Sequence, residues 1–133
     1  MRAVAIIGQA GSGKTTLVDR LRGELLDWQV LGIDAEREAG GDWPTLIARV
    51  ARLDRPAIIE TVLGPTAYIS ALRQYDTLFV RVTCDEAIRQ ARLAERGWEK
   101  TEPIKVRFPR AYEVSGESIS DEAVEWIITA VTT

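Results

Sequence analysis

The chain has 133 residues, of which 46% are hydrophobic, and a formal net charge of −3. This length is typical of one compact domain, and the acidic balance argues against broad nucleic-acid binding. With one cysteine and no histidine, the sequence excludes an internal disulfide and a cysteine zinc site, and any general base must be a carboxylate or a rarer group. Since the N-terminus lacks the form of a signal peptide and no apolar run has the length of a membrane span, we expect a cytoplasmic protein without membrane partners.

An eight-residue stretch near the N-terminus carries the clearest motif. Residues 8–15 read Gly-Gln-Ala-Gly-Ser-Gly-Lys-Thr, the G-x-x-x-x-G-K-T pattern of a phosphate-binding loop. Glycines let the backbone curl until several N–H groups point at one anion. Lys14 adds a positive charge for the outer phosphates, and the Thr15 hydroxyl is suited to hold Mg²⁺. The nucleotide-binding residues predicted from this stretch are Gly8, Gly11, Ser12, Gly13, Lys14, Thr15 and Thr16.

Strand and helix patterns alternate along the chain. Short apolar runs predict strands at 3–8, 30–33, 57–59, 78–82 and 111–114. Helical spacing predicts helices at about 14–26, 42–53, 65–73, 85–95 and 120–131, with Asp42, Asp85 and Ser120 as N-caps. A charged, glycine-bearing stretch, 35–41, separates the second strand from the second helix. The alternation predicts a three-layer α/β/α sandwich around a five-stranded parallel sheet.

We expect residues 1–133 to form a single domain with a mobile lid at about 97–109. This segment begins at Gly97, contains two prolines and lacks clear periodicity. Its basic residues suit it to close over the phosphates of a nucleotide.

Two carboxylates follow predicted strands. Asp34 comes directly after the second strand and Glu60 after the third. In open parallel sheets ligands bind beyond the carboxyl ends of the strands, so both side chains and the phosphate loop can converge on one cleft. Asp34 can accept a proton from an attacking hydroxyl. For Glu60 three roles remain open: holding Mg²⁺, activating the acceptor, or capping a helix.

The phosphate loop, the Asp34-x-x-Arg37 pair and the Arg92-x-x-x-Arg96 helix resemble the small phosphate-binding-loop kinases. This group includes nucleoside and nucleotide kinases, shikimate kinase and polynucleotide 5′-hydroxyl kinase. The resemblance covers essentially the whole chain. It implies the P-loop NTPase fold of nucleotide-kinase type, with ATP as phosphate donor and Mg²⁺ as cofactor.

The resemblance also implies roles for the residues outside the loop. Asp34 and Arg37 would form the acceptor site, with Arg37 clamping a phosphate on the acceptor. Glu60 would join Thr15 at the metal. Arg92 would contact the adenine, and Arg96 would stabilise the transferring phosphoryl group. Together with Lys14, the residues predicted to be catalytic are Asp34 and Arg96.

These features predict an ATP-dependent kinase acting on a nucleoside or nucleotide. A kinase of a hydroxyl on DNA or RNA is the second hypothesis, and a nucleotide-binding NTPase or switch without an acceptor is the third. Only about twenty residues separate Asp34 from the third strand, which leaves room for one helix and not for a larger acceptor domain. The acceptor side can therefore be open.

Three other side chains have plainer expectations. Arg89 is expected on the solvated side of its helix, and Cys84 is expected to be a small buried hydrophobe. Trp43 lies near the cleft, where packing is favoured over stacking on a base.

Overall fold

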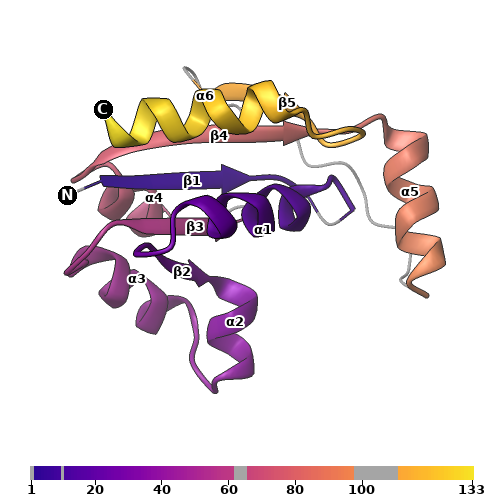
Figure 1. Ribbon diagram of the computed structural model, residues 1–133. Helices are drawn as coiled ribbons and strands as arrows, with labels where there is room; N and C mark the ends of the chain where they lie inside the picture. The colour runs from indigo at the N-terminus through magenta and orange to yellow at the C-terminus, as the bar shows by residue number, and fades with distance from the viewer. Residues whose placement is uncertain (1, 10, 62–65, 98–110) are drawn as a thin grey trace.

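A single parallel sheet organises the molecule (Figure 1). The computed structural model describes residues 2–9, 11–61, 66–97 and 111–133. All strand pairs are parallel, in the order β2-β3-β1-β4-β5. The strands are β1 (Arg2–Ile7), β2 (Gln29–Gly32), β3 (Ala57–Thr61), β4 (Asp76–Thr83) and β5 (Tyr112–Ser115). The helices are α1 (Lys14–Glu24), α2 (Ile33–Glu38), α3 (Trp43–Ala51), α4 (Thr66–Leu72), α5 (Glu86–Glu95) and α6 (Asp121–Thr132).

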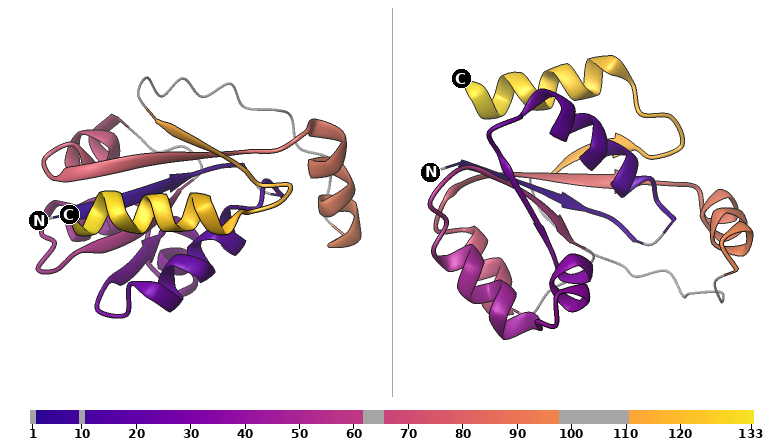
Figure 2. Two further views of the ribbon diagram at one scale, coloured as in Figure 1. Left: turned by 45° about the horizontal axis from the view of Figure 1, so that its top comes forward. Right: turned by 60° about the horizontal axis from the view of Figure 1, so that its bottom comes forward.

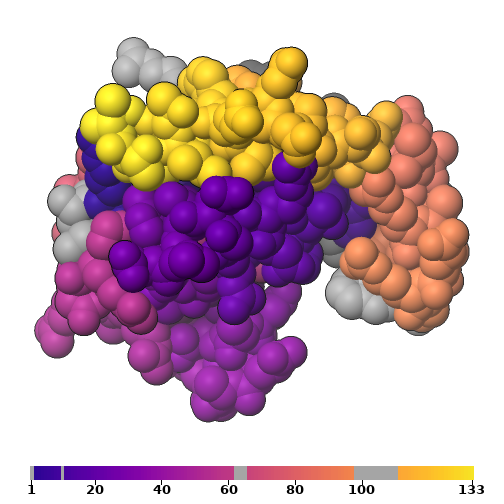
Figure 3. Space-filling model, in the orientation of Figure 1, coloured from indigo at the N-terminus to yellow at the C-terminus, as the bar shows by residue number. Residues whose placement is uncertain are grey.

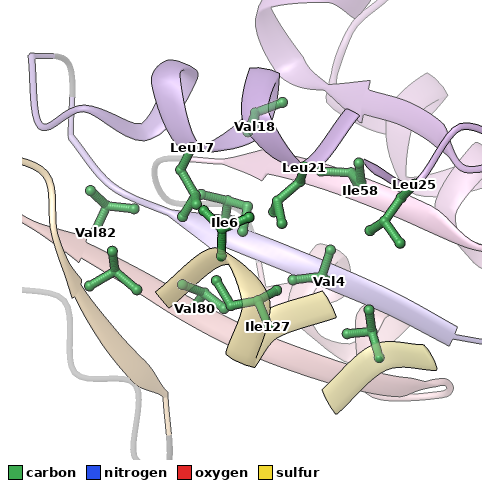
Figure 4. Packing of buried hydrophobic residues seen from close by; sticks show 13 residues of the cluster. Val4, Ile6, Leu17, Val18, Leu21, Leu25, Ile58, Val80, Val82 and Ile127 are labelled. Carbon is green, nitrogen blue, oxygen red and sulfur yellow. The ribbon is translucent and has the colours of Figure 1, made fainter. Parts of the chain in front are cut away.

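Helices cover both faces of the sheet, because side chains alternate along each strand. Val4 and Ile6 of β1 belong to a core cluster with α1 and α6, shown in Figure 4. Ala3 and Ala5 belong to a second cluster with α3 and α4. The right-hand view of Figure 2 shows the two helix pairs on opposite sides of the sheet. The predicted three-layer sandwich is therefore confirmed.

The three predicted N-caps are present. Asp42 accepts a hydrogen bond from Thr45 N, Asp85 accepts one from Ala87 N, and Ser120 accepts one from Ala123 N. Each satisfies a backbone N–H that the first helical turn leaves without a partner. Gly97 follows α5 with φ of +72°, as a helix-terminating glycine does.

Among the element boundaries that differ from the sequence prediction, two bear on the site. The charged stretch 35–41 begins inside α2, so Asp34 and Arg37 lie on a short helix. This helix is held by buried Glu36, whose Oε2 pairs with Arg49 Nε of α3 at 3.0 Å. β3 continues through Glu60 to Thr61, because Thr61 still pairs in register with Ile7 of β1.

The predicted lid lies outside the described residues, apart from Gly97. Across the ranges that the structure describes, none of the helices combines the length and apolar character that a membrane span requires.

Leu21 gives a direct test of the packing between α1 and the sheet. Its side chain is 0% exposed and sits among Ile6, Ile58 and Ile127 in the first core cluster (Figure 4). Leu21→Ala should lower the free energy of unfolding by about 2–5 kcal/mol, because it removes buried apolar area and leaves a cavity. Urea denaturation measures this difference.

Leu26→Ala is the matched control, because Leu26 is 81% exposed. Its effect should stay within about 0.5 kcal/mol. Equal effects of the two substitutions would contradict the assigned core.

Candidate functional site

The phosphate loop leaves the carboxyl end of β1 and turns into α1. Gly8 N donates a hydrogen bond to Thr61 O at 3.2 Å, and Ser12 N donates to Gln9 O at 3.0 Å. Gly11 and Gly13 have φ of +82° and +100°, the left-handed region in which glycine is favoured. Gly13 is the N-cap of α1, so the positive end of the helix dipole faces the loop.

Close contacts show that side chains would not fit in this loop. A Cβ on Gly8 would lie 2.5 Å from Ser12 Oγ, and one on Gly13 would lie 2.6 Å from Gly116 O. Ser12 Oγ is buried and has no hydrogen-bond partner among the described residues. A loop with this glycine-lined backbone and an unpartnered hydroxyl fits a phosphate group, whose oxygens would accept from it.

Lys14 lies at the base of this loop with only 8% of its surface exposed. Burial lowers the pKa of its ammonium, while the charges of Glu60 and Asp34 act in the opposite direction. The same three side chains line one small pocket with Ile33 and Thr61. The structure thus brings together the two strand-end carboxylates and the loop lysine. The roles predicted for them stay predictions.

Thr15 and Glu60 form a direct contact across the loop. Thr15 Oγ1 donates a hydrogen bond to Glu60 Oε1 at 3.0 Å. A hydroxyl and a carboxylate are the hard oxygen ligands that Mg²⁺ takes when it also binds substrate phosphates. Within the described ranges no three His, Cys, Asp or Glu side chains gather into a metal site of their own. The residues present therefore fit a magnesium ion that is carried in with a nucleotide.

Helix α5 stands beyond the carboxyl end of β4 and is separated from α2 by a notch on the surface (Figure 3). Arg92 of α5 reaches back to the phosphate loop. Its Nη1 donates to Gly11 O at 3.2 Å and to Gly116 O at 3.0 Å. Arg92 thereby ties the loop to the turn after β5, whereas Arg96 is exposed at the C-cap of α5.

Arg89 corrects a sequence expectation. Its side chain is 2% exposed, not solvated, and Nη2 pairs with Glu86 Oε1 at 2.6 Å. The stem lies beneath the phosphate loop, since a Cβ on Gly11 would be 3.2 Å from Arg89 Cγ. The Glu86-x-x-Arg89 spacing was the available signal, because residues three apart share a helix face.

A second pocket, of about 360 Å³, opens on the α5 side of the loop. This volume lies in the usual range of about 300–1,000 Å³ for small-molecule sites. Its position beside the phosphate loop suits the base and sugar of a nucleotide. It is lined by Gly13, Thr16, Arg92, Glu95, Arg96, Gly116, Glu117 and Ile119.

The structure confirms some of the remaining expectations and leaves others as predictions. Arg37 is exposed on α2 and is not among the residues that line the small pocket, so its acceptor role stays a prediction. Trp43 packs edge-on against Tyr68 with ring centroids 5.2 Å apart, which confirms the packing expectation. Cys84 is partly exposed rather than buried, because it follows the last residue of β4 in the short connection to α5. The sequence did not single out Thr61, which lines the small pocket one residue beyond Glu60.

The contacts of Arg92 predict a structural effect that Arg96 lacks. Arg92→Ala leaves the Gly11 and Gly116 carbonyls without a charged donor and should lower the unfolding free energy of the ligand-free protein by about 1.5–3 kcal/mol. Arg96→Ala should change it by less than about 0.5 kcal/mol, because Arg96 is exposed. Urea unfolding of both variants measures the difference, and equal values would contradict the bridging role.

Comparison with solved structures identifies the fold. No family model and no curated protein matches the chain. A sugar kinase from Janibacter sp. HTCC2649 is 18% identical with a TM-score of 0.68, and the match covers 99% of this chain and 96% of that one. A gluconokinase from Sinorhizobium meliloti 1021 is 16% identical (TM-score 0.60, 97% and 93% covered). Shikimate kinase from Aquifex aeolicus vf5 is 14% identical (TM-score 0.57, 98% and 95% covered). The chain has the fold of the small phosphate-binding-loop kinases.

Proposed function

We propose that the protein is an ATP- and Mg²⁺-dependent kinase that phosphorylates a hydroxyl group of a small molecule. One observation carries the proposal: Lys14 of the phosphate loop shares a pocket with Asp34 and Glu60. A nucleotide-binding switch needs the loop and the metal pair, but it has no use for a further carboxylate facing the lysine. A kinase needs that carboxylate to take the proton of its acceptor.

The donor side is supported by the pocket between α5 and the phosphate loop. A nucleotide whose phosphates lie in the loop would place its base there, beside Arg92 and Arg96. The loop N–H groups and Lys14 would hold the transferring phosphoryl group in line with the acceptor. Bound Mg²⁺, held at Thr15 and Glu60, would neutralise charge on the phosphates.

The pocket proposed for the acceptor is smaller than the pocket proposed for the nucleotide. The pocket at Asp34 is partly open and has a volume of about 50 Å³, whereas about 10–15 Å³ of cavity volume is enough to hold one water molecule. It therefore accommodates a hydroxyl-bearing arm and not a whole ring. A nucleoside, as the sequence predicts, and a sugar or hydroxy acid, as the neighbours are named, can each present such an arm. A polynucleotide end is less favoured, since no basic surface among the described residues lines this pocket apart from Lys14.

Asp34 tests the kinase chemistry. With Asp34→Asn the side chain keeps its shape but cannot take a proton, so turnover should fall by about 10²–10⁴. The KM for ATP should barely change, because Asp34 lies on the acceptor side of Lys14. The measurement uses γ-labelled ATP with a panel of nucleosides, nucleotides, sugars, hydroxy acids and 5′-hydroxyl DNA.

Asp19→Asn is the control, since Asp19 is exposed on α1 away from the pocket. Full turnover by Asp34→Asn would contradict the role of Asp34 as general base, and Glu60 would then be the candidate base. ATP hydrolysis with no labelled acceptor in the whole panel would instead support an NTPase.

Lys14→Met separates function from stability. Transfer should be lost, because no positive charge remains for the phosphates. The unfolding free energy at neutral pH should not fall below wild type, because burial outweighs the neighbouring carboxylates and disfavours the charged lysine in the folded state. A large loss of stability would contradict this electrostatic reading.

The lowered pKa of Lys14 also predicts how the stability of the protein depends on pH. The folded state binds the Lys14 proton less tightly than the unfolded chain, whose lysine keeps an ordinary pKa near 10.5. Wild type therefore gains stability as pH rises from the lowered folded-state pKa towards that value, while Lys14→Met does not. Urea denaturation of both proteins across the alkaline range should show that the difference between their unfolding free energies becomes smaller as the pH rises.

A further inference from the structure

Helix α2, which carries Asp34, has few attachments to the rest of the molecule. It is six residues long, and its buried side chains are those of Ile33 and Glu36. Ile33 belongs to the second core cluster and begins the helix where β2 ends. A helix of this length is not stable by itself in water, so the position of α2 depends on what these two side chains contact.

Glu36 is an unusual anchor, because a carboxylate is seldom buried unless it is paired. Only 7% of its surface is exposed, and Oε2 lies 3.0 Å from Arg49 Nε of α3. The backbone carbonyl of Glu36 accepts a hydrogen bond from Gly41 N at 2.8 Å. A Cβ on Gly41 would clash with the Glu36 carboxylate, so this carboxylate packs directly against the backbone that follows the helix. One residue thus joins α2, the turn after it and α3.

Helix α3 is a firm support for this ion pair. Leu46 and Val50 of α3 are 0% exposed and belong to the second core cluster. Trp43, the first residue of the helix, packs edge-on against Tyr68 of α4. Since α2 contacts α3 and Arg49 lies on α3, this fixed helix determines where Glu36 can lie (Figure 1).

Asp34 lies on a different side of α2 from Glu36. Residues two apart on an α-helix are separated by about 200° around its axis, so the two carboxylates point in roughly opposite directions. Asp34 lines the small pocket with its neighbours Ile33 and Ala35, and Lys14 lines the same pocket from α1. A rotation or shift of α2 would therefore move the Asp34 carboxylate relative to Lys14.

We propose that Glu36 is a positioning residue for the acceptor site. Through Arg49 and the turn at Gly41 it fixes the orientation of α2 and thereby the place of the Asp34 carboxylate. This assignment rests on the proposed kinase function, in which Asp34 takes the proton of the acceptor. A base must lie within hydrogen-bond reach of the proton it removes, and a misplacement of about 1 Å can cost about 10²-fold in rate.

Glu36→Ala tests this role. With γ-labelled ATP and the acceptor panel given above, kcat per folded protein should fall about ten- to hundredfold. The KM for ATP should not change, because the phosphate loop is held by Arg92. Glu36→Gln keeps the shape and an oxygen that accepts from Arg49 Nε, so its kcat should stay close to wild type. Glu38→Ala is the matched control, since Glu38 is exposed on the same helix, and it should behave as wild type.

Two double variants show whether Glu36 acts through Arg49 and Asp34. Arg49→Ala should lower kcat in the same way, and the double variant Glu36→Ala/Arg49→Ala should be no slower than Glu36→Ala, because the pair is already broken. With Asp34→Asn in place, Glu36→Ala should cause little further loss, because the base that Glu36 positions is already absent. Losses that multiply in the Asp34→Asn background would overturn the positioning role.

Hydrogen exchange gives a readout that does not depend on activity. The N–H groups of Ala39, Gly40 and Gly41 donate the hydrogen bonds that close the end of α2. In ligand-free Glu36→Ala they should exchange about ten- to hundredfold faster, the factor expected for one hydrogen bond to a charged group. Exchange in α1 and α6 should stay at the wild-type rate. Unchanged exchange at α2, or equal acceleration throughout the chain, would overturn the local role of Glu36.

The outcomes separate this assignment from the kinase proposal. Turnover that falls in Asp34→Asn but not in Glu36→Ala overturns the role of Glu36 alone. Absence of transfer to every acceptor overturns the kinase proposal and, with it, the role of Glu36 in catalysis.

Discussion

The close approach of the phosphate loop to its neighbours is the constraint on which the rest of the site depends. A Cβ on Gly13 would clash with the backbone of Gly116, and one on Gly116 would clash with the backbone of Ser12, so neither glycine has room for a side chain. Arg92 bridges the same two segments through the carbonyls of Gly11 and Gly116. Since Gly13 is the N-cap of α1, this contact fixes the direction of the helix N-terminus and the position of Lys14, the first residue of the helix. A loop held on both sides is pre-organised for an anion before any ligand arrives.

Holding Lys14 in this position has an electrostatic consequence. A buried ammonium is unfavourable, and the lowered pKa of Lys14 shows that Glu60 and Asp34 only partly offset the burial. The folded state therefore disfavours the charged form of Lys14 relative to the unfolded chain. Such a conflict between stability and local charge is expected at a functional site. Binding of a phosphate would relieve this conflict, because the ligand would place further negative charge beside the Lys14 ammonium.

The sequence predicted what depends on local pattern, and missed what depends on tertiary contact. The alternating apolar runs, the N-caps at Asp42, Asp85 and Ser120 and the loop motif are all readable within a few residues. Arg89 was wrongly expected in solvent because its burial arises from the phosphate loop folding over it. Thr61 was missed for a related reason: it is an ordinary strand residue until the fold places the end of β3 beside Lys14 and Asp34.

The two halves of the site are built from separate parts of the fold. The pocket proposed for the donor is lined by α1, α5 and the turn after β5, whereas the pocket proposed for the acceptor is lined by β2, α2 and the end of β3. The acceptor side is fastened independently, by the ion pair of Glu36 with Arg49 between α2 and α3. The hydrogen bond from Thr15 to Glu60 links α1 to the end of β3 between these two pockets. Under the proposed function, substitutions in α2 would therefore alter which acceptor is bound while the phosphate loop keeps its geometry. On that proposal, the acceptor would be recognised by the residues around Asp34, apart from those that hold the nucleotide.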